Sequence, residues 1–86
     1  MSPEQVKQLI EQGLDADSVE VTGGDGHFDI RVVGECFVGQ SLVQKQKLVY
    51  ATLNPQITSG EIHAVTIKAY TPDEWQKAQV FQGGSI

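Results

Sequence analysis

The chain has 86 residues, the length of one small domain, and its six basic and eleven acidic side chains give a formal net charge of −5. This balance argues against a strong non-specific nucleic-acid binder, because affinity for phosphates comes mostly from Lys and Arg, although it leaves room for a local basic patch. The single cysteine, Cys36, cannot form an intrachain disulfide and favours a reducing compartment. No signal-peptide pattern and no apolar run of membrane-spanning length is visible, so we expect a cytoplasmic protein that does not enter a membrane.

The first third of the chain predicts a helix followed by a β-hairpin. Residues 2–5 combine a serine cap, a proline at the first helical position and a glutamine that completes a capping box. Apolar residues at helical spacing follow. Alternating apolar and polar side chains over 19–22 and 28–32 predict two strands, and the glycine-rich run 23–26 is expected to form the turn of an antiparallel hairpin.

A second helix is expected over 42–53, capped by Ser41, with residues 44–47 on its exposed side. Proline disfavours helical geometry in the residue before it, so Pro55 is expected to interrupt this helix. One further short turn could follow before Gly60 ends the segment.

The last third of the chain predicts a strand and a short helix. Alternation over 63–70 is typical of a third strand, and residues 71–74 form another capping box with proline at the first helical position. The predicted order is α-β-β-α-(α)-β-α. It describes an α/β (α+β) domain over 1–80, with helices on one face of a three-stranded sheet, followed by a flexible tail over 81–86.

A family pattern runs through most of the chain, from about residue 6 to residue 77. Five short segments carry it: Asp-Gly-His-Phe-Asp-Ile at 25–30, Phe-Val-Gly at 37–39, Leu-Val-Gln-Lys-Gln-Lys-Leu-Val-Tyr at 42–50, Ile-His-Ala-Val at 62–65 and Thr-Pro-Asp-Glu-Trp at 71–75. In their order and spacing the chain resembles the BolA-like family, most closely its IbaG (YrbA) branch. The resemblance implies a class II KH-like fold with a three-stranded mixed sheet. Because no catalytic triad, carboxylate pair at helical spacing or nucleotide fingerprint is visible, we do not expect an enzyme.

The resemblance also implies a partner and a cofactor. BolA-like proteins bind monothiol glutaredoxins and can share a bridging [2Fe–2S] cluster with them, in iron–sulfur trafficking, iron homeostasis or stress responses. The glutaredoxin cysteine and glutathione hold one side of that cluster. His63 matches the family's C-terminal histidine ligand, and His27 is the candidate second ligand, from the loop between the first two strands. The isolated chain is expected to hold no cluster and to be a monomer or a weak dimer.

Taken by themselves, the residues leave more than one interpretation of each histidine open. A neutral imidazole suits iron, and histidine in place of cysteine raises the potential of a [2Fe–2S] centre. His63 could instead end the core and bond a neighbouring carbonyl, and His27 could be an exposed loop histidine without a role. Cys36 is expected to behave as a small, buried or half-buried hydrophobe.

The candidate partner-binding residues are three lysines and two aromatic residues: Lys45, Lys47, Lys68, Tyr70 and Trp75. Trp75 would either pack on the core or frame a partner surface near His63. Lys45 and Lys47 also carry an alternative function, that of a nucleic-acid-binding transcriptional regulator using the KH-like fold. Against it stand the net charge, the missing first glycine of a GxxG clamp at 37–40, and Lys-Gln-Lys where many BolA members have Arg-His-Arg.

Overall fold

The computed structural model describes residues 1–83 and has an α+β architecture. Its elements, in chain order, are α1 (Pro3–Gly13), β1 (Ser18–Gly24), β2 (His27–Val33), a 3-10 turn η1 (Glu35–Phe37), α2 (Leu42–Ser59), β3 (Ala64–Tyr70) and α3 (Pro72–Gly83). The predicted fold class is therefore confirmed, with two differences: the optional helix after α2 is not separate, and α3 does not join the other helices on the covered face of the sheet. None of the described helices has the combination of length and apolar character that crossing a membrane requires.

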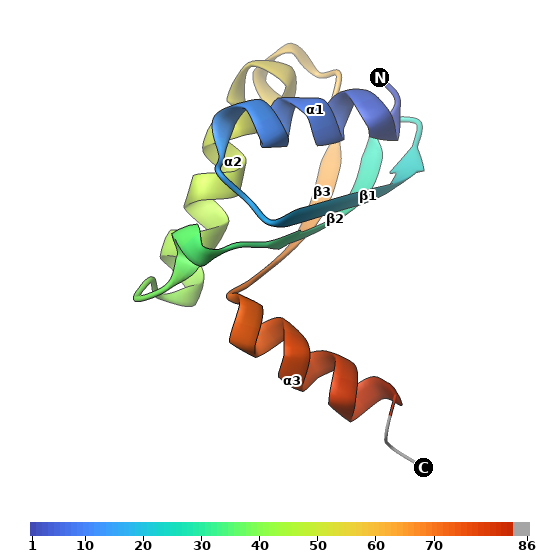
Figure 1. Ribbon diagram of the computed structural model, residues 1–86. Helices are drawn as coiled ribbons and strands as arrows, with labels where there is room; N and C mark the ends of the chain where they lie inside the picture. The colour runs from blue at the N-terminus through green and yellow to red at the C-terminus, as the bar shows by residue number, and fades with distance from the viewer. Residues whose placement is uncertain (84–86) are drawn as a thin grey trace.

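The three strands form a mixed sheet with β2 in the centre. β1 pairs with β2 in antiparallel orientation, and β3 pairs with β2 in parallel orientation. Parallel neighbours need a long crossover, and α2 supplies it between β2 and β3. α1 and α2 pack together against one face of the sheet, whereas α3 extends away from the end of β3 (Figure 1).

The core fills the space between that face of the sheet and the two helices. Strand alternation sends every second side chain toward it, which is the pattern expected of a sheet covered on one side. Its fully buried large side chains are Phe37, Ile10, Leu53, Val6, Val32 and Val49. The opposite face of the sheet carries mostly polar side chains and is not covered by α1 or α2.

The hairpin turn is shorter than predicted. Gly23 and Gly24 belong to β1, where they pair with Phe28 and His27, so only Asp25 and Gly26 form the turn. Asp25 and Gly26 both have positive φ, 54° and 81°, which is the backbone pattern of a two-residue type I′ turn. Glycine is rare within strands, and the expected four-residue turn was wrong for that reason.

The second helix does not stop at Pro55, contrary to the prediction. α2 runs unbroken from Leu42 to Ser59 and ends at Gly60, whose φ of 86° provides the expected left-handed cap. Leu53 is completely buried and Ile57 packs on the core, so the helix is held by packing on both sides of Pro55. Tertiary burial here outweighs the local preference of proline.

Three capping boxes begin the three helices, two of them as predicted. In the first, the backbone N–H of Ser2 donates to Gln5 Oε1 over 2.8 Å, and in the last, that of Thr71 donates to Glu74 Oε1 over 2.8 Å. A third box joins Ser41 and Gln44. α3 continues to Gly83, into the segment expected to be a tail, and residues 84–86 of that segment lie outside the described part of the chain.

Candidate metal centre

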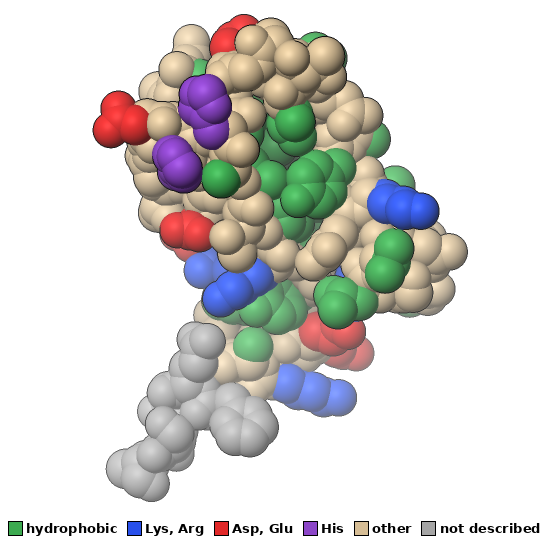
Figure 2. Space-filling view, turned by 180° about the vertical axis from the view of Figure 1, so that it is seen from behind, with side chains coloured by type: hydrophobic (Ala, Val, Ile, Leu, Met, Phe, Trp, Pro, Cys, Tyr) green, Lys and Arg blue, Asp and Glu red, His purple; other side chains and the backbone are tan. Residues whose placement is uncertain are grey.

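The parallel pairing of β2 and β3 brings the two histidines together. His27 is the first residue of β2. His63 lies directly before β3, because that strand begins at Ala64, one residue later than the start that we predicted. In the register of the sheet, His27 is opposite Ala64, so both side chains emerge at the same end. Their ring centroids are 6.3 Å apart with an angle of 30° between the ring planes. Both are exposed, and they lie side by side on the surface, at the end of the molecule away from α3 (Figure 2).

The hairpin turn holds the segment that carries His63. The carbonyl oxygen of Gly26 accepts hydrogen bonds from the backbone N–H of His63 over 2.7 Å and from that of Ala64 over 3.0 Å. These bonds tie the loop before β3 to the type I′ turn before β2. The position of His63 relative to His27 is therefore set by main-chain bonding, while both imidazoles stay accessible.

This donor set fits one side of an iron–sulfur cluster. Imidazole nitrogens ligate iron in [2Fe–2S] centres of the mixed His and Cys type. Two imidazoles on one tetrahedral metal ion would have ring centroids about 5 Å apart, given a metal–nitrogen bond of about 2.1 Å. The observed spacing is 6.3 Å, and because both side chains are exposed, rotation about their side-chain bonds can bring the rings to the shorter spacing. Among residues 1–83, no group of three or more His, Cys, Asp or Glu side chains is placed to hold a metal.

Cys36 does not join the histidines. It follows β2, at the other end of that strand from His27, and its half-buried side chain packs on the core, as predicted. Burial raises the pKa of the Cys36 thiol above its ordinary value, a backbone hydrogen bond offsets part of this rise, and the carboxylates of Asp15 and Asp17 add smaller increases. The thiol is thus kept in its protonated form, which is a poor metal ligand.

Lys45 is buried and ion-paired, which corrects its predicted place on the exposed side of the second helix. Its side chain is 8% exposed, and its Nζ donates to both carboxylate oxygens of Glu74, over 2.7 and 2.9 Å. A lysine is seldom buried unless paired, and its partner here is 29 residues away in sequence. The patch of two lysines on which the nucleic-acid alternative depends is therefore not formed, because only Lys47 is exposed.

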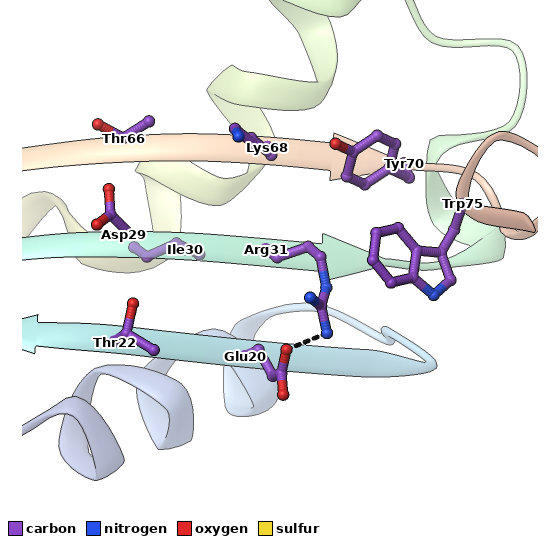
Figure 3. A pocket seen from close by; sticks show the side chains of 9 residues that line it. All are labelled: Glu20, Thr22, Asp29, Ile30, Arg31, Thr66, Lys68, Tyr70 and Trp75. Carbon is purple, nitrogen blue, oxygen red and sulfur yellow. Dashed lines mark ion pairs between the residues drawn. The ribbon is translucent and has the colours of Figure 1, made fainter. Parts of the chain in front are cut away.

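The other candidate partner residues gather on the uncovered face of the sheet. Lys68, Tyr70 and Trp75 line a shallow hollow of about 390 Å³ there (Figure 3). The rings of Trp75 and Tyr70 have centroids 5.3 Å apart, and the guanidinium carbon of Arg31 lies 4.2 Å from the centroid of the Trp75 ring. Trp75 therefore packs on the open face of the sheet and not in the core.

Arg31 and Glu20 belong to this surface but were not among the predicted site residues. They are direct partners across the β1–β2 pair, and their side chains form an ion pair. Opposite charges at outward-facing positions of the hairpin could have indicated this pair. The sequence alone does not give the exact strand register, which is needed to see that the two residues are opposite each other.

His63 and Trp75 lie at opposite ends of β3. His63 precedes the strand and Trp75 follows it, and a seven-residue strand is about 20 Å long. The expectation that Trp75 frames a surface near His63 is thus wrong. The histidine pair and Trp75 are therefore separated along the sheet, although the hollow that Trp75 lines extends toward the histidines as far as Asp29 and Thr66.

Comparison with known proteins gives a consistent result. The family model described as BolA-like protein matches residues 4–74. Acid stress protein IbaG of Escherichia coli is 40% identical over 83 residues, which cover 96% of this chain and 99% of the relative. A protein from the rpoN-murA intergenic region of Acinetobacter guillouiae is 44% identical over 81 residues, which cover 94% of this chain and 98% of that relative. The crystal structure of a Bol-like protein from Babesia bovis superposes with a TM-score of 0.79 at 30% identity, covering 92% of this chain and 94% of that one.

The chain belongs to the BolA-like family. Its similarity to IbaG extends over nearly the full length of both chains, so the resemblance to the IbaG branch found in the sequence is confirmed.

Proposed function

We propose that this protein is a non-enzymatic adaptor that binds a monothiol glutaredoxin and supplies His63 and His27 as ligands of a bridging [2Fe–2S] cluster. The observation that carries the proposal is the pair of exposed imidazoles, 6.3 Å apart, at one end of the molecule. Membership of the BolA-like family and similarity to a relative named acid stress protein support a setting in iron–sulfur trafficking, iron homeostasis or stress response.

The number of ligands supports a shared cluster. A [2Fe–2S] cluster takes four ligands from its surroundings, and the histidine pair accounts for two. The glutaredoxin cysteine and the thiolate of glutathione would supply the other two. Since histidine in place of cysteine raises the reduction potential, transfer of the cluster into this mixed environment would change its redox behaviour as well as its location.

Co-purification with a monothiol glutaredoxin tests this function. The protein, the glutaredoxin and glutathione are reconstituted with iron and sulfide, and the complex is isolated by size exclusion with its iron content measured. We expect a 1:1 complex whose visible absorption differs from that of the glutaredoxin alone. His63→Ala and His27→Ala should change that spectrum, whereas Gln12→Ala, at an exposed site on α1, should leave it as it is. A complex that never forms would reject the proposal.

A further inference from the structure

Gly26 lies against the Cδ2 edge of the His63 ring. A Cβ atom built on Gly26 would overlap Cδ2 of His63 and would lie 3.1 Å from its Cγ and 3.4 Å from its Nε2. The same residue accepts both backbone hydrogen bonds from His63 and Ala64 through its carbonyl oxygen. The imidazole therefore occupies the space that any other residue at position 26 would fill with its side chain.

Other glycines of the chain show that this contact is specific. Gly24, two residues earlier in the same hairpin, has no atom within 4 Å of a Cβ built on it. Gly39, in the loop before α2, has the same positive φ of 81° as Gly26 and also has open space around its Cβ position. Positive φ alone would account for a glycine at 26, as it does at 39. The ring of His63 is an additional reason that applies only to Gly26.

We propose that Gly26 is a positioning residue for the ligand pair: its carbonyl holds the backbone of His63, and its missing side chain lets the imidazole lie beside His27. The consequence for a cluster rests on the proposed function, but the placement of the ring is a property of the free protein. A residue with a Cβ at position 26 would push the ring away from its partner while leaving His63 itself unchanged.

A side chain at position 26 should displace the ring of His63 without unfolding the protein. His63 is exposed, so its side chain can rotate into solvent at little cost when a Cβ is added at position 26. A second cost comes from positive φ, which disfavours alanine and lowers the folded-to-unfolded ratio by roughly 5- to 30-fold. Gly39→Ala carries the same backbone cost without the contact. Gly26→Asn reduces the backbone cost, because asparagine tolerates positive φ, and retains the Cβ.

Nuclear Overhauser contacts in the free protein test the placement. In the wild type, in Gly24→Ala and in Gly39→Ala, the ring protons of His63 should show contacts to the α protons of residue 26 and to the ring of His27. In Gly26→Ala and Gly26→Asn these contacts should be lost, with the amide spectrum otherwise that of the folded protein. Contacts that persist in both position-26 variants would overturn the proposal.

The complex with glutaredoxin then separates this inference from the proposed function. The visible circular dichroism of the complex should change in Gly26→Asn toward that of His63→Ala, and it should not change in Gly39→Ala. If the contacts are lost but neither Gly26→Asn nor His63→Ala alters the spectrum, Gly26 places the ring as proposed and the ligand role of His63 is wrong. If only His63→Ala alters it, the ligand role stands and the positioning role of Gly26 is rejected.

Discussion

Lys45 and Glu74 form an asymmetric ion pair. The side chain of Lys45 is 8% exposed and that of Glu74 is 47% exposed, so only the lysine depends on its partner to replace lost water. Glu74 also accepts a hydrogen bond from the backbone N–H of Thr71 at the start of α3. By accepting from Lys45 as well, it joins α3 to α2.

This asymmetry predicts unequal effects of removing either charge. Glu74→Gln can still cap α3 but leaves a buried ammonium without a charged acceptor, and should lower the free energy of unfolding by about 1–3 kcal/mol. Lys45→Met keeps the buried stem and leaves a carboxylate that water can solvate, and should cost less than about 1 kcal/mol. Urea denaturation measures both values. A larger loss for Lys45→Met than for Glu74→Gln would contradict this account of the pair.

The same pair predicts the response of stability to acid. The hydrogen bond from Lys45, followed by that from the Thr71 backbone, holds the pKa of Glu74 below its ordinary value of 4.5. The stabilisation is therefore complete above that value and is lost as the pH falls through the lower pKa of the folded state. Denaturant unfolding below pH 4.5 should show a steeper loss for the wild type than for Glu74→Gln. Parallel curves for the two proteins would show that Glu74 does not contribute.

At the scale of elements, α2 contains a proline that should destabilise it. Pro55 lacks the N–H that would bond the carbonyl of Ala51, and its ring crowds that carbonyl. Pro55 is exposed, so replacing it by alanine leaves no cavity. After the entropy that proline removes from the unfolded chain is subtracted, Pro55→Ala should raise the free energy of unfolding by about 1–2 kcal/mol. A thermal or urea transition that moves in the destabilising direction would indicate that Pro55 serves the native state.

α3 is the element most weakly joined to the rest of the molecule. Its links to the rest of the molecule include the contact of Glu74 with Lys45 and the packing of Trp75 on Tyr70 and Arg31. Helices with so little burial open before the core does.

Trp75 is the only tryptophan, so its fluorescence reports on the packing of α3 against the sheet. We expect its emission to shift to the red at a urea concentration below the midpoint seen by far-ultraviolet circular dichroism. In Glu74→Gln the gap between the two transitions should widen, because the link to α2 is weakened. Coincident transitions in both proteins would instead mean that α3 unfolds with the core as one unit.

At the scale of the whole molecule, local signals in the sequence predict most of the fold. The predicted caps at Ser2, Ser41 and Thr71 and the predicted strand alternation are confirmed, because each depends on neighbours a few residues apart. The predictions that Pro55 interrupts the second helix and that Lys45 is exposed are wrong, because both depend on packing or pairing with distant residues.

The candidate site was less accessible to sequence reasoning. His27 and His63 are 36 positions apart, and only the parallel register of β2 and β3 places them side by side. Periodicity gives no register for parallel strands, so the pair came from the family resemblance and not from the pattern. The space that Gly26 leaves for the ring of His63 could not be predicted at all, since a positive-φ turn already explains that glycine.

The overall arrangement separates the histidine pair from Trp75 and α3 by the length of β3. A glutaredoxin that reaches both histidines would approach the end of the molecule opposite α3 (Figure 2). Cluster binding and the stability of α3 are therefore expected to respond to different substitutions.

The most direct test is the visible circular dichroism of the reconstituted glutaredoxin complex, recorded for the wild type and for His63→Ala at equal iron content. If the histidine pair ligates the cluster, the spectrum of the variant should differ from that of the wild type and the cluster should be lost more readily. Superimposable spectra, with both proteins still bound to glutaredoxin in a 1:1 complex, would contradict the account.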